Sequence, residues 1–212
     1  MTRIIHSVLI LAIVVGFGLL LRQHASVRDL RVERNRLAAK YGFFDIHDKD
    51  KFHVQQLKTK DPYYFAWRVY KPGGISAWHK DEWCLGGSSG GGGVQAEGRE
   101  FVFRCRFTFE DGRPEAHTLR DSGSSRPGFS HPVLSKFLLE NWDLLDVELL
   151  DNGEYSQDDI LSFIKVTMPE SVRGNLRGLR PRELERLATM PVFSSVYGKK
   201  EVLEEAERTQ TQ

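Results

Sequence analysis

The sequence predicts an α+β chain: an N-terminal transmembrane helix continues into a short coiled-coil helix, and a mainly antiparallel β domain with one or two packed helices follows. Three observations carry this prediction. They are an uncharged apolar run at 4–21, a three-four repeat of apolar residues within 23–44, and an alternation of aromatic and polar residues at 99–110. The length of 212 residues suits one ordinary domain plus accessory segments.

Composition narrows the function classes. A formal net charge of +1 argues against a strongly basic nucleic-acid-binding protein and against an acidic disordered chain, so we expect no nucleic-acid partner. The two cysteines, Cys84 and Cys105, are too few for a disulfide-built fold and lack the spacing of a zinc or C-x-x-C redox site. A bridge between them would form only on an oxidising side of a membrane.

A membrane anchor is predicted at 4–21, after an N-terminal tail at 1–3. As a helix this run is about 27 Å long, close to the thickness of the hydrocarbon layer. A cleaved signal peptide is the alternative, because Arg3 and the apolar run suit one. However, Arg22 follows the run directly, and Gln23 stands where a cleavage site before residue 26 would need a small side chain. We therefore expect an uncleaved, single-pass anchor in contact with membrane lipid.

The side of the membrane that the soluble domain faces stays open. Basic residues are concentrated after the span, which by the positive-inside rule favours a cytoplasmic domain: Arg22, Arg28, Arg31, Arg34, Arg36 and Lys40. The very short N-terminal tail would also be easy to translocate, and short-tailed bacterial anchors commonly export the domain that follows. The same basic stretch could contact anionic lipids or serve only as a topology determinant.

The segment 22–42 is predicted to be a coiled-coil or stalk helix. Five of seven positions spaced alternately by four and three are apolar or aromatic, in the series Gln23, Val27, Leu30, Arg34, Leu37, Tyr41 and Phe44. This is the seam pattern of a two-stranded coil, so a homodimer through residues 23–44 is one expectation. A stalk helix that packs on its own domain fits the pattern equally well. Gly42 can end the helix.

The β-rich domain is expected at 43–170, beginning with a charged linker or irregular element at 43–60. The strand around Tyr63–Val69 turns at Pro72-Gly73-Gly74, and Ile75–His79 can return as a second strand. The strand at 99–110 has one aromatic and one polar face, which is typical of an antiparallel sheet. Asp111-Gly112 then favours a hairpin to residues 115–120.

Further elements follow to the C-terminus. Ser130 and Pro132 open a helix that could cover the apolar face of the sheet. Strands are expected at 144–150 and 160–168 around the turn at 151–153, although Ser156-x-x-Asp159 is also a helix-start signal. The segment 171–212 is expected to be helical and partly flexible. It has a short amphipathic helix after Pro181 and a polar tail from residue 201 that frays.

Two serine motifs suggest the hypothesis of a serine hydrolase. Ser88 lies in the G-x-S-x-G pattern of residues 86–90, but the glycines that follow do not favour the helix of a nucleophile elbow, so a mobile surface loop at 86–98 is expected. Ser122, in Asp121-Ser122-Gly123, matches the serine region of chymotrypsin-like proteases without the matching histidine segment. We assign no catalytic, cofactor-binding or metal-binding residue.

Two other groups of residues have the chemistry of a binding site. Carboxylates and imidazoles gather at Asp45, His47, Asp48, Asp50 and His53, but the glycine and terminal carboxylate of a calcium loop are missing, so a solvated surface is expected. Trp78 and Trp83, near the aromatics of 63–67, could line a ligand site, although aromatic residues that alternate in a sheet are usually core.

The stretch Leu30-Arg31-Val32-Glu33-Arg34-Asn35-Arg36-Leu37, followed by Phe65-Ala66-Trp67-Arg68-Val69-Tyr70-Lys71-Pro72, resembles uncharacterised single-span membrane proteins of planctomycete bacteria. The resemblance covers about the first 75 residues. It implies a span, a short coil and a β-rich domain, and it implies no activity, ligand or catalytic residue.

These observations favour a membrane-tethered interaction or assembly module without evident catalytic activity and with an unidentified protein partner. The alternatives are a membrane-bound serine hydrolase that uses Ser88 or Ser122, and an envelope ligand-binding domain that uses the Trp78 and Trp83 region.

Overall fold

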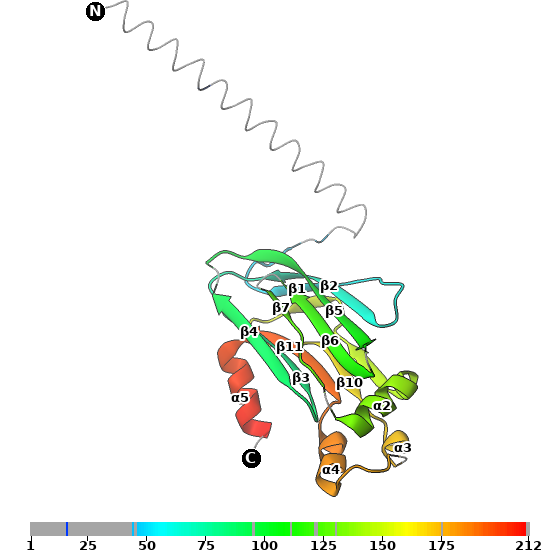
Figure 1. The fold of residues 1–212 in the computed structure, drawn as a ribbon. Coiled ribbons are helices and arrows are strands. Elements are labelled where there is room, and N and C mark those ends of the chain that lie inside the picture. The colour runs from blue at the N-terminus through cyan, green and yellow to red at the C-terminus, as the bar shows by residue number, and fades with distance from the viewer. Residues whose placement is uncertain are drawn as a thin grey trace, which may run out of the picture. The chain divides into compact units, whose positions relative to one another are not determined.

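The computed structural model describes Gly16, Phe44 and the ranges 46–94, 96–110, 112–120, 123–129, 131–174 and 176–210 (Figure 1). The chain divides into two compact units, Met1–Asp45 and Ile46–Gln212. The predicted span at 4–21 and coil at 22–42 fall in the first unit and, Gly16 apart, lie outside the described residues. Within the described part of the chain, no helix is long and apolar enough to cross a membrane.

The second unit contains two antiparallel sheets. Sheet A has six strands in the order β7 (Gly123–Ser125), β6 (Arg113–Arg120), β5 (Arg99–Glu110), β2 (Tyr64–Lys71), β1 (Phe52–Leu57) and β9 (Gly153–Tyr155). Sheet B has five strands in the order β4 (Ser88–Val94), β3 (Ser76–Trp83), β11 (Phe193–Lys199), β10 (Leu161–Thr167) and β8 (Asp146–Leu149). The prediction of a mainly antiparallel β domain is thereby confirmed, and a few helices accompany the two sheets.

Aromatic side chains fill the space between the two sheets. On β5, Phe101, Phe103, Cys105 and Phe107 are buried, whereas the alternate residues are exposed or half-buried, as the sequence pattern predicts. Phe103 stacks on Phe163 of β10, with ring centroids 4.2 Å apart and planes at 10°. Each such buried side chain contributes about 1.5–3 kcal/mol by leaving water. We call residues 46–199, enclosed by these two sheets, the sandwich.

The predicted hairpin between β5 and β6 is confirmed. Glu110 pairs with Arg113, and Gly112 between them has φ of +71°, a conformation that glycine adopts without strain. The predicted pairing of the strands near 144–150 and 160–168 is confirmed by β8 and β10. Between them β9 pairs with β1, so this connection passes from sheet B to sheet A and back.

The chain reversal at 72–74 does not produce the expected pairing of two neighbouring strands. β2 is already bonded to β1 on one edge and to β5 on the other, so β3 crosses to sheet B. The linker expected at 43–60 is also wrong in part, because Phe52 and Val54 of β1 are buried. The charged residues lie mainly in the turn before β1. They make the whole segment look like a linker in the sequence, although β1 is a strand of sheet A between β2 and β9.

The mobile loop expected at 86–98 is replaced in large part by β4, which pairs with β3 from Glu82↔Ser88 to Ser76↔Val94. The glycines allow the two backbones to approach closely. A Cβ atom added at Gly92 would lie 2.1 Å from the carbonyl oxygen of Ala77, and one added at Gly90 would lie 2.7 Å from that of His79. The prediction failed because strand signals rest on side chains, which glycine lacks.

Three helices gather at one end of the sandwich, α2 (Pro132–Asn141), α3 (Glu170–Arg173) and α4 (Pro181–Thr189) (Figure 1). The helix expected after Ser130 is α2. Its N-cap is His131, whose Nδ1 accepts the Leu134 N–H at 3.3 Å, and Leu134 and Leu138 are fully buried. The short 3-10 turn η1 (Trp142–Leu144) follows, and α4 matches the helix expected after Pro181.

The C-terminal segment, which was expected to be helical and partly flexible, contains one strand that the sequence did not predict. Strand β11 lies beyond residue 170 and joins sheet B between β3 and β10. Helix α5 (Lys200–Gln210) follows it where a fraying tail was expected, with Leu203 only 8% exposed. An ion pair of 2.9 Å joins Lys80 Nζ of β3 to Glu207 Oε1, which ties α5 to the outer face of sheet B.

Candidate functional site

A cluster of polar side chains lies inside the sandwich. Strand β3 turns His79 and Asp81 inward, in register with Ala77 and Trp83 on the same face. Four members are at most 1% exposed, which is unusual for charged and hydroxyl groups. We call the following residues the polar cluster: His79 and Asp81 of β3, Thr118 and Arg120 of β6, Ser125 of β7 and Ser195 of β11.

Asp81 lies at the centre of the polar cluster. Its Oδ2 accepts hydrogen bonds from the Thr118 hydroxyl at 2.5 Å and from the Ser125 hydroxyl. Its Oδ1 lies 2.9 Å from Nε2 of His79. Burial alone would raise the pKa of Asp81, but the contacts with His79 and the two hydroxyl groups outweigh it and lower the pKa of this carboxyl below its usual value.

The contacts of His79 fix the roles of its two ring nitrogens. Nδ1 contacts the Arg120 guanidinium, and arginine can only donate, so Nδ1 accepts. Nε2 therefore carries the hydrogen, and it lies 3.0 Å from the Ser195 hydroxyl oxygen as well as 2.9 Å from Asp81 Oδ1.

Ser195, His79 and Asp81 are the residue types of a serine hydrolase, but their arrangement differs from a catalytic triad. A triad uses one ring nitrogen for the nucleophile and the other for the carboxylate. Here one nitrogen faces both Ser195 and Asp81, and Arg120 contacts the second. Ser195 is also 0% exposed, so its hydroxyl is shielded from solvent. The geometry supports a structural role in which strands of sheet A and sheet B share one hydrogen-bonded network.

Ser88 and Ser122, the two serines of the hydrolase hypothesis, are not members of the polar cluster. Ser88 is exposed at the start of β4, opposite Glu82, and a strand follows it where a nucleophile elbow needs a helix. Ser122 lies outside the described residues. The structure thus places Ser88 away from the inward-facing His79.

Trp78 and Trp83, the tryptophans of the ligand-binding hypothesis, point to opposite faces of sheet B. Trp83 is 1% exposed and its Nε1 donates to the Pro127 carbonyl at 3.1 Å, so it belongs to the core. Trp78 is half-buried on the other face, where Lys200 Nζ of α5 lies 5.0 Å from the ring centre. This cation–π contact joins α5 to sheet B.

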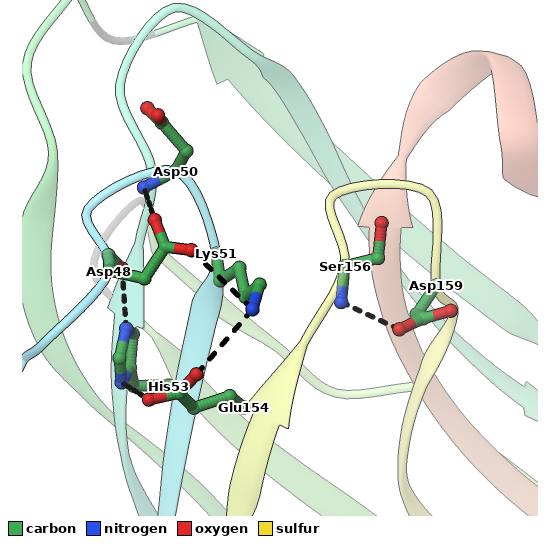
Figure 2. A network of polar contacts seen from close by, with 7 residues as sticks. All are labelled: Asp48, Asp50, Lys51, His53, Glu154, Ser156 and Asp159. Carbon is green, nitrogen blue, oxygen red and sulfur yellow. Dashed lines mark hydrogen bonds and ion pairs between the residues drawn. The ribbon is translucent and has the colours of Figure 1, made fainter.

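The carboxylates and imidazoles near β1 form a second polar network (Figure 2). Lys51 Nζ lies 3.4 Å from Asp48 Oδ2 and 3.7 Å from Glu154 Oε2, while His53 Nε2–H donates to the Asp48 carbonyl at 2.5 Å. Asp48 Oδ1 also accepts the backbone N–H of Asp50 at 2.9 Å, and that hydrogen bond lowers the pKa of Asp48.

These contacts close the turn before β1 and join it to β9. The nearby turn after β9 is held separately, because the Ser156 N–H donates to Asp159 Oδ2 at 2.6 Å, where a helix start was the alternative prediction (Figure 2). Among the described residues, no group of three His, Cys, Asp or Glu side chains is arranged to hold a metal ion. Asp45 of the predicted cluster lies outside those residues.

The four edge strands of the sandwich differ in charge. β8 exposes Asp146 and Glu148, and β9 carries Glu154. β7 has only three residues. β4 has seven residues, Ser88–Val94, none of which is charged, and most of them are exposed. Since charges normally protect an open sheet edge from further pairing, β4 is the least protected edge of the described sandwich.

The arginines near the C-terminus surround α3 and α4. Arg180 pairs with Glu183, and the Arg173 guanidinium donates to the Leu187 carbonyl at 3.4 Å. The paired arginine is the largest cause that lowers the pKa of Glu183 to about 2. These two contacts are local and help to shape the α3–α4 region.

The polar cluster had no detectable signal in the sequence, because its members come from four strands and Ser195 is 116 residues from His79.

Comparison with protein-family models, with curated proteins and with solved structures finds no match for this chain.

Proposed function

We propose that this chain is a single-span, membrane-tethered interaction or assembly module whose sandwich binds a protein partner and has no evident catalytic activity. The observation that carries the proposal is the burial of its most enzyme-like residues. His79, Asp81 and Ser195 are at most 1% exposed and contact one another on the inner face of sheet B. Such a network stabilises a folded scaffold, whereas a catalytic group must meet its substrate.

The tether is supported by the sequence before the sandwich. Residues 4–21 contain no Asp, Glu, Lys or Arg, and Arg3 and Arg22 flank them. A helix of this length matches the hydrocarbon layer, and flanking arginines extend toward the headgroups. One span would leave the whole sandwich on a single side of the membrane. The seam at 23–44 supports assembly of two copies.

Alkaline carbonate extraction of membranes that contain the full-length chain tests the tether. The unprocessed chain is expected in the membrane pellet. Leu11→Arg with Val15→Arg places two charges in the middle of the span, each costing about 2.5–3.5 kcal/mol, and should shift the chain to the supernatant. Leu139→Arg is the control, because Leu139 is 48% exposed on α2 of the sandwich. Release of the unsubstituted, full-length chain would contradict the proposal.

Two further measurements complete the test. Protease accessibility of the sandwich in sealed vesicles assigns the side of the membrane. A serine-reactive probe is expected to label neither Ser88 nor Ser122, and specific labelling that Ser88→Ala or Ser122→Ala abolishes would establish a hydrolase in place of the proposed module.

A further inference from the structure

The open edge of β4 is the feature of the sandwich that most resembles a docking surface. β4 ends sheet B, bonds to β3 on one side, and has no further strand beside it among the described residues (Figure 1). The strand exposes main-chain groups and carries only serine, glycine and valine side chains. An edge of this kind can accept an added strand through main-chain hydrogen bonds.

Strand β4 lies very close to its neighbour β3. Gly90 and Gly92 lie so close to β3 that a Cβ atom would meet the carbonyl oxygens of His79 and Ala77. A Cβ atom on Gly91 would lie 3.5 Å from Nη2 of Arg120, which belongs to the polar cluster. The glycines therefore lie close to the β3 backbone, with which the strand pairs along its whole length. An edge that is already ordered loses less conformational entropy on binding.

We propose that β4 pairs antiparallel with β4 of a second copy of this chain, so that the two B sheets join into one. This inference rests on the proposed function, since it names the contact by which tethered copies assemble. In a twofold contact each surface meets itself. The acidic edges β8 and β9 would then place like charges together, whereas uncharged β4 meets its copy without repulsion.

The pairing has a defined register. Gly91 is the middle residue of β4, and a pair centred on it places Ser88 opposite Val94 of the second copy at both ends. Seven residues bury much less than the roughly 1,000 Å² of a stable interface. The contact therefore depends on copies that are already concentrated by the membrane and by the coil at 23–44, which raise the effective concentration.

Disulfide formation in the full-length chain in proteoliposomes tests this register. Ser88→Cys with Val94→Cys should give an intermolecular bridge under mild oxidation, because directly opposed strand residues lie within disulfide range. The two positions are about 20 Å apart in one strand, so they cannot bridge within one copy. Each single variant should give at least ten-fold less bridged product. The matched pair on the acidic edge, Asp146→Cys with Leu149→Cys, should give none.

Amide hydrogen exchange of β4 in the same proteoliposomes provides a readout without cysteines. Ser88→Lys with Val94→Lys sets like charges opposite each other and should speed exchange at β4 at least ten-fold. Ser88→Glu with Val94→Lys sets opposite charges together and should retain the protection of the unsubstituted chain.

The outcomes separate this contact from the tether and the coil. If Leu30→Cys in the coil seam bridges and the β4 pair does not, the β4 contact is overturned while assembly through the coil stands. If the β4 pair bridges whether or not Leu30→Cys does, the contact is supported. If neither bridges in chains that resist carbonate extraction, the β4 contact and coil assembly fail and the tether stands. Equal bridging by a single variant would overturn the register.

Discussion

At the scale of single residues, the least expected feature is a charged network inside an aromatic core. Moving the Asp81 carboxylate, which is 0% exposed, out of water costs several kcal/mol unless its contacts replace water. The structure supplies those contacts from His79, Thr118 and Ser125. Because the partners come from both sheets, the network favours one way of stacking sheet A on sheet B over others. Aromatic packing alone would specify that stacking less strictly.

Removing the charge of Asp81 should destabilise the sandwich. Asp81→Asn keeps the shape of the side chain but withdraws the negative charge that faces His79 and the two hydroxyl donors. We expect the free energy of unfolding to fall by about 3 kcal/mol. Urea denaturation measures it, and Asp143→Asn on the exposed surface is the control. A change below about 0.5 kcal/mol would show that the network contributes little.

Asp81 should contribute to the pH dependence of the free energy of unfolding. The pKa of Asp81 is lowered in the folded chain, so between its folded and unfolded pKa values the unfolded chain binds more protons. Its contribution is therefore complete above about pH 4 and is lost as the pH falls through the folded pKa. Unfolding free energies measured from pH 5 downward should decrease more steeply for the unsubstituted chain than for Asp81→Asn. Parallel curves would contradict this assignment.

At the scale of elements, the sequence predicts a strand or helix where side chains on its two faces differ. β5 was predicted with its bounds because aromatic and polar residues alternate along it, and α4 because Leu184 and Leu187 recur on one side after Pro181. β4 offers no side chains, and in β11 the fully buried Ser195 breaks the apolar pattern. These strands form because a neighbouring strand provides a hydrogen-bonding edge, which no local pattern records.

The glycines of β4 should differ sharply in their tolerance of alanine. At Gly92 the added Cβ would lie 2.1 Å from Ala77 O and 2.7 Å from Trp78 Cα, both backbone atoms that cannot move alone. Gly92→Ala should therefore cost about 1–3 kcal/mol of unfolding free energy.

Gly93→Ala is the matched control, because no atom lies within 4 Å of its added Cβ. It should leave stability unchanged or raise it by up to about 1 kcal/mol, since alanine restricts the unfolded chain. Thermal or urea unfolding of the two variants compares them directly. Equal losses would mean that β4 does not approach β3 as closely as the structure places it.

The start of α4 depends on a charged cap. Glu183 accepts the Arg180 backbone N–H at 2.8 Å and the Arg180 guanidinium Nε–H at 2.7 Å, so its pKa is lowered to about 2. Its stabilising effect is present above the ordinary glutamate pKa and is lost as the pH falls through about 2. Carboxyl-carbon NMR should show that midpoint, and Arg180→Ala should move it upward. A midpoint near 4 in the unsubstituted chain would contradict the cap.

At the scale of the whole molecule, the two sheets form one cooperative unit because the chain passes between them repeatedly. The β2–β3 connection, the β4–β5 connection and β9 each place sequence neighbours in opposite sheets. These crossings could not be predicted, since the pattern of each strand defines its faces but not its partners. The polar cluster was missed for the same reason, as its residues meet only after β3, β6, β7 and β11 are stacked.

The two cysteines report on this cooperativity. Cys84 and Cys105 are free thiols at 1% and 0% exposure, and burial raises the pKa of both. The thiolate is the reactive form, so maleimide should modify neither residue while the sandwich is closed. Because Cys105 lies in β5 of sheet A and Cys84 directly follows β3 of sheet B, a cooperative opening should expose both together.

Mass spectrometry during pulsed labelling in increasing urea should show one transition from no label to two. Leu144→Cys, at a position that is 53% exposed on η1, should react at once and control for reagent access. A populated species with label on Cys84 alone would show that sheet B opens before sheet A, and that the two sheets do not unfold as a unit.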